Sequence, residues 1–96
     1  MSDKLQDLLI FRTIKLEYPI TDGHSNEVTE LKMRRAKAKD IRKMQSEKDS
    51  AAQEIFLFAQ LTGLVMEDID ELDIADYAKL QDAFKDMTKG KSTLSN

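Results

Sequence analysis

The chain has 96 residues, a formal net charge of −3 and no cysteine. A chain of this length forms one domain with a modest core. Hydrophobic residues make up 41% of it and charged residues 34%, a balance typical of a well-solvated globular protein and not of a disordered one. The lack of cysteine excludes disulfide bonds, thiolate zinc sites and a cysteine nucleophile, and it suits a reducing cytoplasm.

No segment of the sequence has the length or composition of a membrane anchor. The longest uninterrupted apolar run covers residues 55–59, whereas a membrane-spanning helix needs about 20 apolar residues. Residues 1–7 have neither the basic start nor the apolar core of a secretory signal. We therefore expect a soluble, cytosolic protein that has no membrane partner.

The first predicted element is a β-hairpin over about residues 10–35, preceded by a flexible segment, 1–9. Every second residue of the first strand except Arg12 is apolar, which predicts one buried face, formed by Ile10, Ile14, Leu16, Tyr18 and Ile20. Pro19 cannot donate a backbone hydrogen bond, so this strand is a sheet edge or ends there.

A turn rich in polar residues, 21–26, joins the two predicted strands. We expect Gly23 to supply a positive φ in this turn, since glycine adopts that conformation at no steric cost. The second strand, about 27–35, then places Leu31 and Met33 on the inner face. An isolated hairpin is only marginally stable in water, so helices must cover its apolar face.

Three to four short helices are predicted after the hairpin, at about 40–46, 50–62, 66–72 and 74–89, followed by a flexible tail, 90–96. Asp40 is placed as a cap or first-turn acid, and Ser50 to Gln53 fit a capping box. Gly63 is a typical residue for the end of the second helix, and Asp73 to Asp76 form another helix start. The fold class is therefore α+β, with a single domain over residues 10–89.

The sequence offers no arrangement of residues that indicates catalysis or metal binding. The one histidine, His24, lies in a turn without a second metal-ligating histidine or cysteine. The acidic run 68–72 is not a calcium loop, because its fifth and sixth positions are Leu72 and Asp73, where the loop needs a ligand and glycine. We expect no enzyme activity, no catalytic residues, no metal and no cofactor.

The charges of the chain are strongly segregated. The basic segment, residues 32–43, holds seven lysines and arginines against one acid, whereas residues 67–76 contain acids and no base. These blocks could guide a charged partner, order self-association into a homo-oligomer, or face each other within the fold. The basic segment also makes a small nucleic-acid-binding or regulatory protein the alternative function, although its lack of aromatic residues and the pI of about 5.1 speak against it.

The order of several short motifs resembles the phage tail assembly chaperones of Mu-like and related contractile-tailed phages. The matching stretches are residues 16–20, 28–42, 61–64 and 72–80, and the likeness spans residues 14–84. The most specific part is the double arginine followed by an acid. The motif residues are Pro19, Gly23, Arg34, Arg35, Asp40, Gly63 and Asp76.

This resemblance implies a chaperone that binds the tape measure protein and keeps it soluble until the tail tube polymerises around it. It implies action in the cytoplasm of an infected or lysogenic bacterial host, and absence from the mature virion. Many members of the family also exist as a longer form made by ribosomal frameshifting. A slippery run of guanines and adenines could encode residues 89–91 here, so a frameshifted longer form is a further expected partner.

The predicted helix 50–62 is apolar around nearly its whole circumference, which is more than a small domain readily buries. Our hypothesis is that part of this surface, with nearby methionines, contacts the tape measure protein. The alternative is that the same residues are all core. The candidate contact residues are Ile55, Phe56, Phe58 and Leu61, with Met44 and Met66.

Overall fold

A computed structural model describes residues 11–89. Strands β1 (Phe11–Thr21) and β2 (Glu27–Arg34) form an antiparallel hairpin, and four helices follow it: α2 (Ala38–Met44), α3 (Ser50–Thr62), α4 (Met66–Asp70) and α5 (Ile74–Met87). The structure thus confirms the α+β class with an N-terminal hairpin. The flexible ends predicted at 1–9 and 90–96, together with Ile10, lie outside the described residues.

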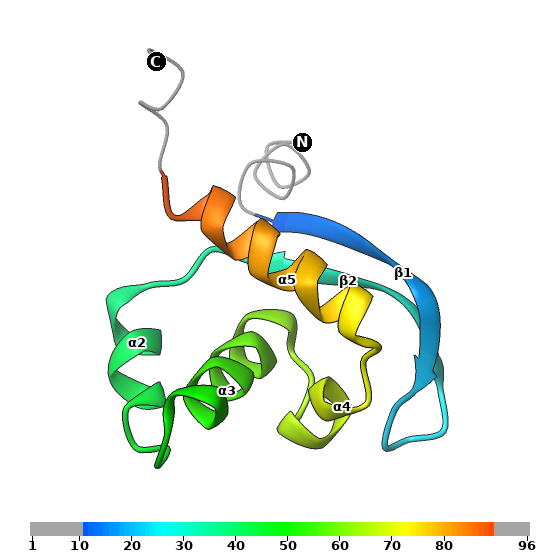
Figure 1. The fold of residues 1–96 in the computed structure, drawn as a ribbon, viewed down its shortest axis with the longest axis horizontal. Helices are drawn as coiled ribbons and strands as arrows, with labels where there is room; N and C mark the ends of the chain where they lie inside the picture. The colour runs from blue at the N-terminus through cyan, green and yellow to red at the C-terminus, as the bar shows by residue number, and fades with distance from the viewer. Residues whose placement is uncertain (1–10, 90–96) are drawn as a thin grey trace, which may run out of the picture.

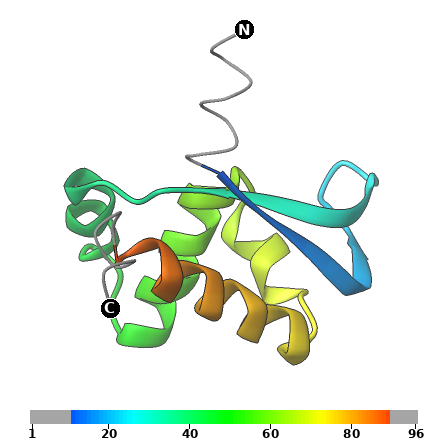
Figure 2. The same ribbon diagram turned by 90° about the horizontal axis from the view of Figure 1, so that it is seen from above.

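The longest two helices cover one face of the hairpin. Helix α5 contacts β1, helix α3 contacts β2, and the short helices α2 and α4 both pack against α3. Figure 1 shows α5 crossing the hairpin, with α3 lying between α2 and α4. Figure 2 shows α3 and α5 on the same side of the two strands. This arrangement gives the hairpin the apolar support that its sequence requires.

The alternation of β1 is broken by a large bulge. Lys15 pairs with Glu30, but Ile20 pairs with Val28, so residues 16–19 of β1 lie opposite Thr29 alone. The prediction that Tyr18 belongs to the buried face is therefore wrong, because the extra residues turn it outward and leave it 56% exposed. Pro19 lies in the same bulge, where the missing N–H costs the ladder nothing, and β1 continues past it.

The turn between the strands depends on Asp22 and Ser25. The Asp22 carboxylate accepts hydrogen bonds from the backbone N–H of His24 (2.8 Å) and Asn26 (3.0 Å), and the Ser25 N–H donates to the Asp22 carbonyl (3.1 Å). The residue with positive φ is Ser25, at 65°, so the prediction for Gly23 is wrong. Hairpin loops of three residues need the left-handed conformation at their last position, and Ser25 occupies it.

Ser25→Gly should stabilise the protein by about 0.5–1 kcal/mol, because glycine adopts a positive φ without the steric cost that serine pays. Urea unfolding followed by circular dichroism measures the change as a higher transition midpoint. Ser25→Ala is the matched control: it removes the same hydroxyl but keeps Cβ, so it should not stabilise the chain. A lower midpoint for Ser25→Gly would contradict this account of the turn.

Side chains cap the starts of α3 and α5, and the cap of α3 lies one residue before the predicted one. Helix α3 is capped by Asp49, whose carboxylate accepts from the Ala52 N–H at 2.8 Å; the predicted box beginning at Ser50 starts one residue too late. The Asp73 carboxylate caps α5 as predicted, and Gly63 ends α3 with a φ of 80°. Helix α2 begins at Ala38, which places Asp40 in its first turn.

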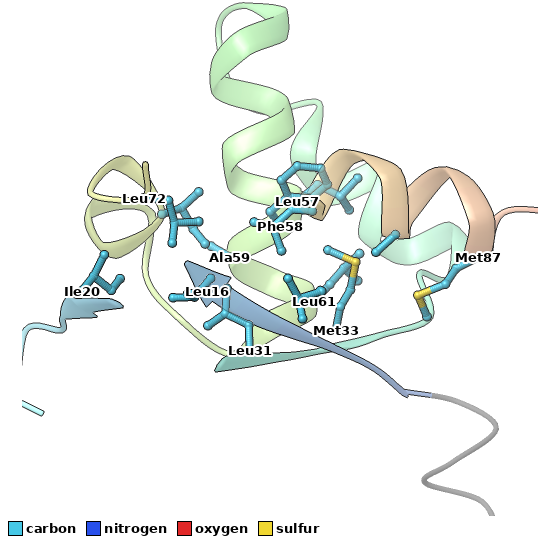
Figure 3. Packing of buried hydrophobic residues seen from close by; sticks show 14 residues of the cluster. Leu16, Ile20, Leu31, Met33, Leu57, Phe58, Ala59, Leu61, Leu72 and Met87 are labelled. Carbon is cyan, nitrogen blue, oxygen red and sulfur yellow. The ribbon is translucent and has the colours of Figure 1, made fainter. Parts of the chain in front are cut away.

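The core lies between the hairpin and helices α3, α4 and α5. Phe58 is completely buried at its centre, with its ring centroid 5.5 Å from that of Tyr77 and 6.0 Å from that of Phe84. Met33, Leu80 and Ile69 are buried around it, and Figure 3 shows how side chains from the hairpin and the helices meet there. The core is thus built from segments distant in sequence.

Candidate functional site

The only acid of the basic segment, Asp40, is completely buried at the start of α2. Both of its carboxylate oxygens accept hydrogen bonds from the Arg34 guanidinium, each at 2.9 Å. The Lys37 backbone N–H also donates to it at 2.8 Å, and the Gln60 amide lies 3.5 Å away. One carboxylate therefore ties the end of β2 to the first turn of α2 and to α3.

These contacts hold Asp40 in its charged form. The bidentate hydrogen bonds from Arg34 lower the pKa of this carboxyl far below its ordinary value, and the Lys37 N–H lowers it further, although burial opposes both. The first arginine of the double-arginine motif thus has a structural role. The second, Arg35, is exposed, and its carbonyl accepts a hydrogen bond from Arg34 at 3.0 Å.

A second buried carboxylate, Asp76, holds the bulge of β1. Its two oxygens accept hydrogen bonds from the backbone N–H groups of Glu17 (2.9 Å) and Tyr18 (3.0 Å). The ammonium of Lys79 lies 3.6 Å from the same carboxylate and donates to the Lys15 carbonyl at 3.0 Å. The bulge leaves two N–H groups without partners in the hairpin, and the first turn of α5 supplies their acceptors.

The environment of Asp76 also favours its charge. Burial raises the pKa of this carboxyl, but the hydrogen bonds from Glu17 and Tyr18 and the charge of Lys79 outweigh burial, so the net pKa lies below the ordinary value. Four of the motif residues thus have clear structural roles: Arg34, Asp40, Gly63 and Asp76. Pro19, Gly23 and Arg35 are exposed.

The structure separates the six candidate contact residues into two groups. Phe58 and Leu61 are 0% and 2% exposed and belong to the core, so their side chains offer no surface to a partner. The remaining four are partly exposed. They are Met44, Ile55, Phe56 and Met66. Helix α3 is thus core on the side facing the hairpin and α5, and its partly exposed apolar side chains lie on its other sides.

An apolar groove lies between α2, α3 and α5 beside Met44. We call it the Met44 groove; its volume is about 230 Å³. Met44 and Phe84 line it together with the polar Ser50, Gln53 and Glu54, and its other two lining residues, Leu57 and Phe58, are buried. A second hollow, the Ile41 groove, has a volume of about 260 Å³ between α2 and α5. It is lined by Ala36, Ile41, Phe84 and Met87, with Arg35 and Lys37 also beside it.

Phe84 lies on an apolar stripe of α5 with Tyr77, Leu80 and Met87, and sequence reasoning missed its part in these grooves. Phe84 packs against the core and also lines both grooves, because α2 is too short to cover the C-terminal half of α5. The shortness of α2 was the available signal, since seven residues make only two turns. Where an apolar stripe on one helix is longer than the helix that covers it, the uncovered apolar side chains line a groove.

Residues 11–89 contain neither a candidate metal site nor a candidate membrane span. No three or more acidic, histidine or cysteine side chains within this range are grouped as a metal ion would require. Nor does any helix in the same range combine the length and the hydropathy of a membrane span.

Comparison with known proteins identifies one family. A family model described as "Phage tail assembly chaperone proteins, E, or 41 or 14" matches residues 13–89, most of the chain. Neither the curated proteins nor the solved structures contain a significant match. The matched range includes Asp40, Asp76, the whole of α3 and both grooves.

Proposed function

Because the chain belongs to the phage tail assembly chaperone family, we propose that it binds the tape measure protein and keeps it soluble until the tail tube polymerises around it. The proposed role is non-catalytic. It is exercised in the cytoplasm of the bacterial host, and the chaperone is absent from the mature virion.

The observation that carries this proposal is the apolar surface left on and beside α3. A long helical client exposes apolar stripes, and a partner with a groove and exposed apolar side chains covers such stripes by helix-in-groove packing. The Met44 groove offers this geometry, because three helices form its walls and its lining is mostly apolar. Three further apolar side chains, outside this groove, are partly exposed: Ile55 and Phe56 on α3 and Met66 at the start of α4.

Phe56 is the best single residue with which to test this surface. It is partly exposed, and it is neither part of the buried core cluster nor among the side chains packed against that cluster. Ile55, Met44 and Met66, by contrast, all pack against the core. A change at Phe56 therefore separates partner binding from folding better than a change at the other three.

Phe56→Asp should reduce co-purification of the co-expressed tape measure protein at least about tenfold, since a charge would be buried against the apolar stripe of the client. Circular dichroism and thermal unfolding of the purified variant should show a folded protein. The amount of tape measure protein recovered in the soluble fraction is the second readout.

Two controls accompany this variant. Ala51→Asp adds the same charge to the exposed first turn of α3 and should leave co-purification unchanged, whereas Phe56→Leu keeps an apolar side chain and should retain binding. If Phe56→Asp is folded and the tape measure protein is still recovered normally, the surface around Phe56 does not bind the client. If Phe56→Asp does not fold, Phe56→Ser provides the same comparison with a neutral side chain.

A further inference from the structure

The charged blocks of the sequence form two separate ends of the folded molecule. The basic end consists of exposed side chains in and before α2: Arg35, Lys37, Lys39, Arg42 and Lys43. The acidic end consists of exposed side chains of α4 and the residue after it: Glu67, Asp70 and Glu71. The two helices lie on opposite sides of α3 (Figure 1), so the blocks do not face each other within the fold.

Within residues 11–89, the charges of both ends have no ion-pair partner. Five ion pairs occur within residues 11–89, and none of them includes a side chain of the basic end or the acidic end. The one ion pair inside the basic segment joins Arg34 to Asp40, which neutralises the only acid there. Each end therefore presents charge of one sign.

Each end carries apolar surface beside its charges. At the acidic end, Val65 directly precedes α4, two residues before Glu67, and is 54% exposed, and Ile74, the first residue of α5, is 78% exposed. At the basic end, the Ile41 groove opens between α2 and α5, with Arg35 and Lys37 among its lining residues. One end thus has exposed apolar side chains flanked by acids, and the other has an apolar groove flanked by bases.

We propose that these two ends bind each other between copies of this chain, with the acidic end of one copy seated on the basic end of the next. Val65 then lies over the Ile41 groove, and Glu67, Asp70 and Glu71 lie against the bases that surround it. Since the two surfaces differ, the contact is head-to-tail, and repeating it produces an open row or a closed ring.

Charge decides against the symmetric alternatives. An isologous dimer through α2 would place the five bases of one copy against those of its partner, and one through α4 would oppose the acids. Like charges at an interface cost several kcal/mol, whereas opposite charges steer association. A head-to-tail row also aligns successive α3 surfaces along a long helical client; this last consequence rests on the proposed function, but the self-association does not.

The wild-type chain should associate at low salt and dissociate at high salt. The Debye length falls from about 10 Å at 0.1 M to about 3 Å at 1 M, so salt weakens contacts between exposed charges. Sedimentation velocity of nuclease-treated protein without any client should give an average mass that rises with concentration at about 0.05 M salt and monomers at about 0.5 M. A monomer at low salt and millimolar concentration would overturn the proposal.

Charge reversal of either end should abolish the association, and mixing the two variants should restore it. Arg35→Glu with Lys37→Glu and Lys39→Glu leaves two bases and three acids at the basic end, so both ends are acidic. Asp70→Lys with Glu71→Lys leaves one acid and two bases at the acidic end, so both ends are basic; all five side chains are exposed. Each variant alone should be monomeric at low salt, because its ends repel. An equimolar mixture should recover at least half of the wild-type association, because basic ends then meet acidic ends.

A matched control separates position from net charge. Two acid-to-lysine changes add four charges, so Asp70→Lys with Glu71→Lys raises the net charge from −3 to +1. Glu27→Lys with Asp82→Lys gives the same net charge from exposed sites on β2 and α5 and should keep the wild-type association. Loss of association in this control, a mixture that stays monomeric, or a low-salt complex that proves to contain nucleic acid would each overturn the proposal.

Discussion

Asp40→Asn should lower the free energy of unfolding at pH 7 by about 3 kcal/mol, because it leaves the Arg34 guanidinium without its counter-charge. The carboxylate is completely buried, and it accepts two hydrogen bonds from Arg34 and one from the Lys37 N–H. Asparagine has the same shape as aspartate but only one acceptor oxygen. Its NH₂ group therefore faces N–H donors that the second carboxylate oxygen accepted from. The Arg34 side chain is 32% exposed, and water therefore offsets part of the loss.

Urea unfolding followed by circular dichroism measures this change. Arg35→Gln is the matched control: it removes the adjacent exposed arginine, which has no ion pair in the described part of the chain, and should change stability by less than about 0.5 kcal/mol. Arg34→Met combined with Asp40→Asn should cost less than the sum of the two single changes, since the pair is coupled. Additive costs would show that the two side chains do not stabilise each other.

The sequence predicted the elements whose signals are local. Gly63 at the end of α3 and the Asp73 cap of α5 were found because helix termini leave backbone groups that only certain nearby residues satisfy. The inward positions of Leu31 and Met33 followed from simple alternation in a strand without a bulge. Asp49 was missed because Asp49 and Ser50 are both good caps, and adjacent candidates differ little in sequence.

Features created by distant residues could not be predicted in this way. The bulge that exposes Tyr18 is held by Asp76, which is 58 positions later in the chain. The division of α3 into core and surface was equally hidden, because nearly every side of the helix is apolar and a helical wheel does not show which side faces the hairpin. Phe58 and Phe56 differ by two positions, yet the first is the centre of the core and the second is outside it.

The charged blocks illustrate the same limit. The sequence showed that bases and acids are segregated, but it left open whether they meet inside the molecule. Only the placement of α2 and α4 on opposite sides of α3 answered this, and that placement comes from packing between helices. The double-arginine motif similarly splits into Arg34, which binds Asp40, and Arg35, which remains on the surface beside the Ile41 groove.

Asp76→Asn should lower the free energy of unfolding at pH 7 by about 2 kcal/mol and should also make stability less sensitive to acid. The buried carboxylate accepts both bulge N–H groups, from Glu17 and Tyr18, and asparagine has only one oxygen for them. A buried donor left without an acceptor costs about 1–3 kcal/mol. The amide protons of Glu17 and Tyr18 should consequently exchange faster with solvent in the variant than in the wild type.

The acid dependence follows from the direction of the pKa shift. The folded pKa of Asp76 is lowered, as is that of Asp40, whereas an aspartate in the unfolded chain titrates near about 3.9. Each carboxylate thus stabilises the fold fully above the unfolded pKa and loses this contribution as pH falls through the folded pKa. Below about pH 4 the unfolded chain binds more protons, and each group adds up to about 1.4 kcal/mol per pH unit to the slope.

Urea unfolding between pH 7 and pH 3 measures that slope for the wild type and for Asp76→Asn. The variant should be less stable at neutral pH but should lose less stability per pH unit in the acid range, because one titrating carboxylate is gone. Asp82→Asn, on the exposed face of the same helix, should leave stability at pH 7 within about 0.5 kcal/mol of the wild type. An unchanged acid slope in Asp76→Asn would mean that the bulge is held by the backbone alone, and that the start of α5 does not fix the shape of the hairpin.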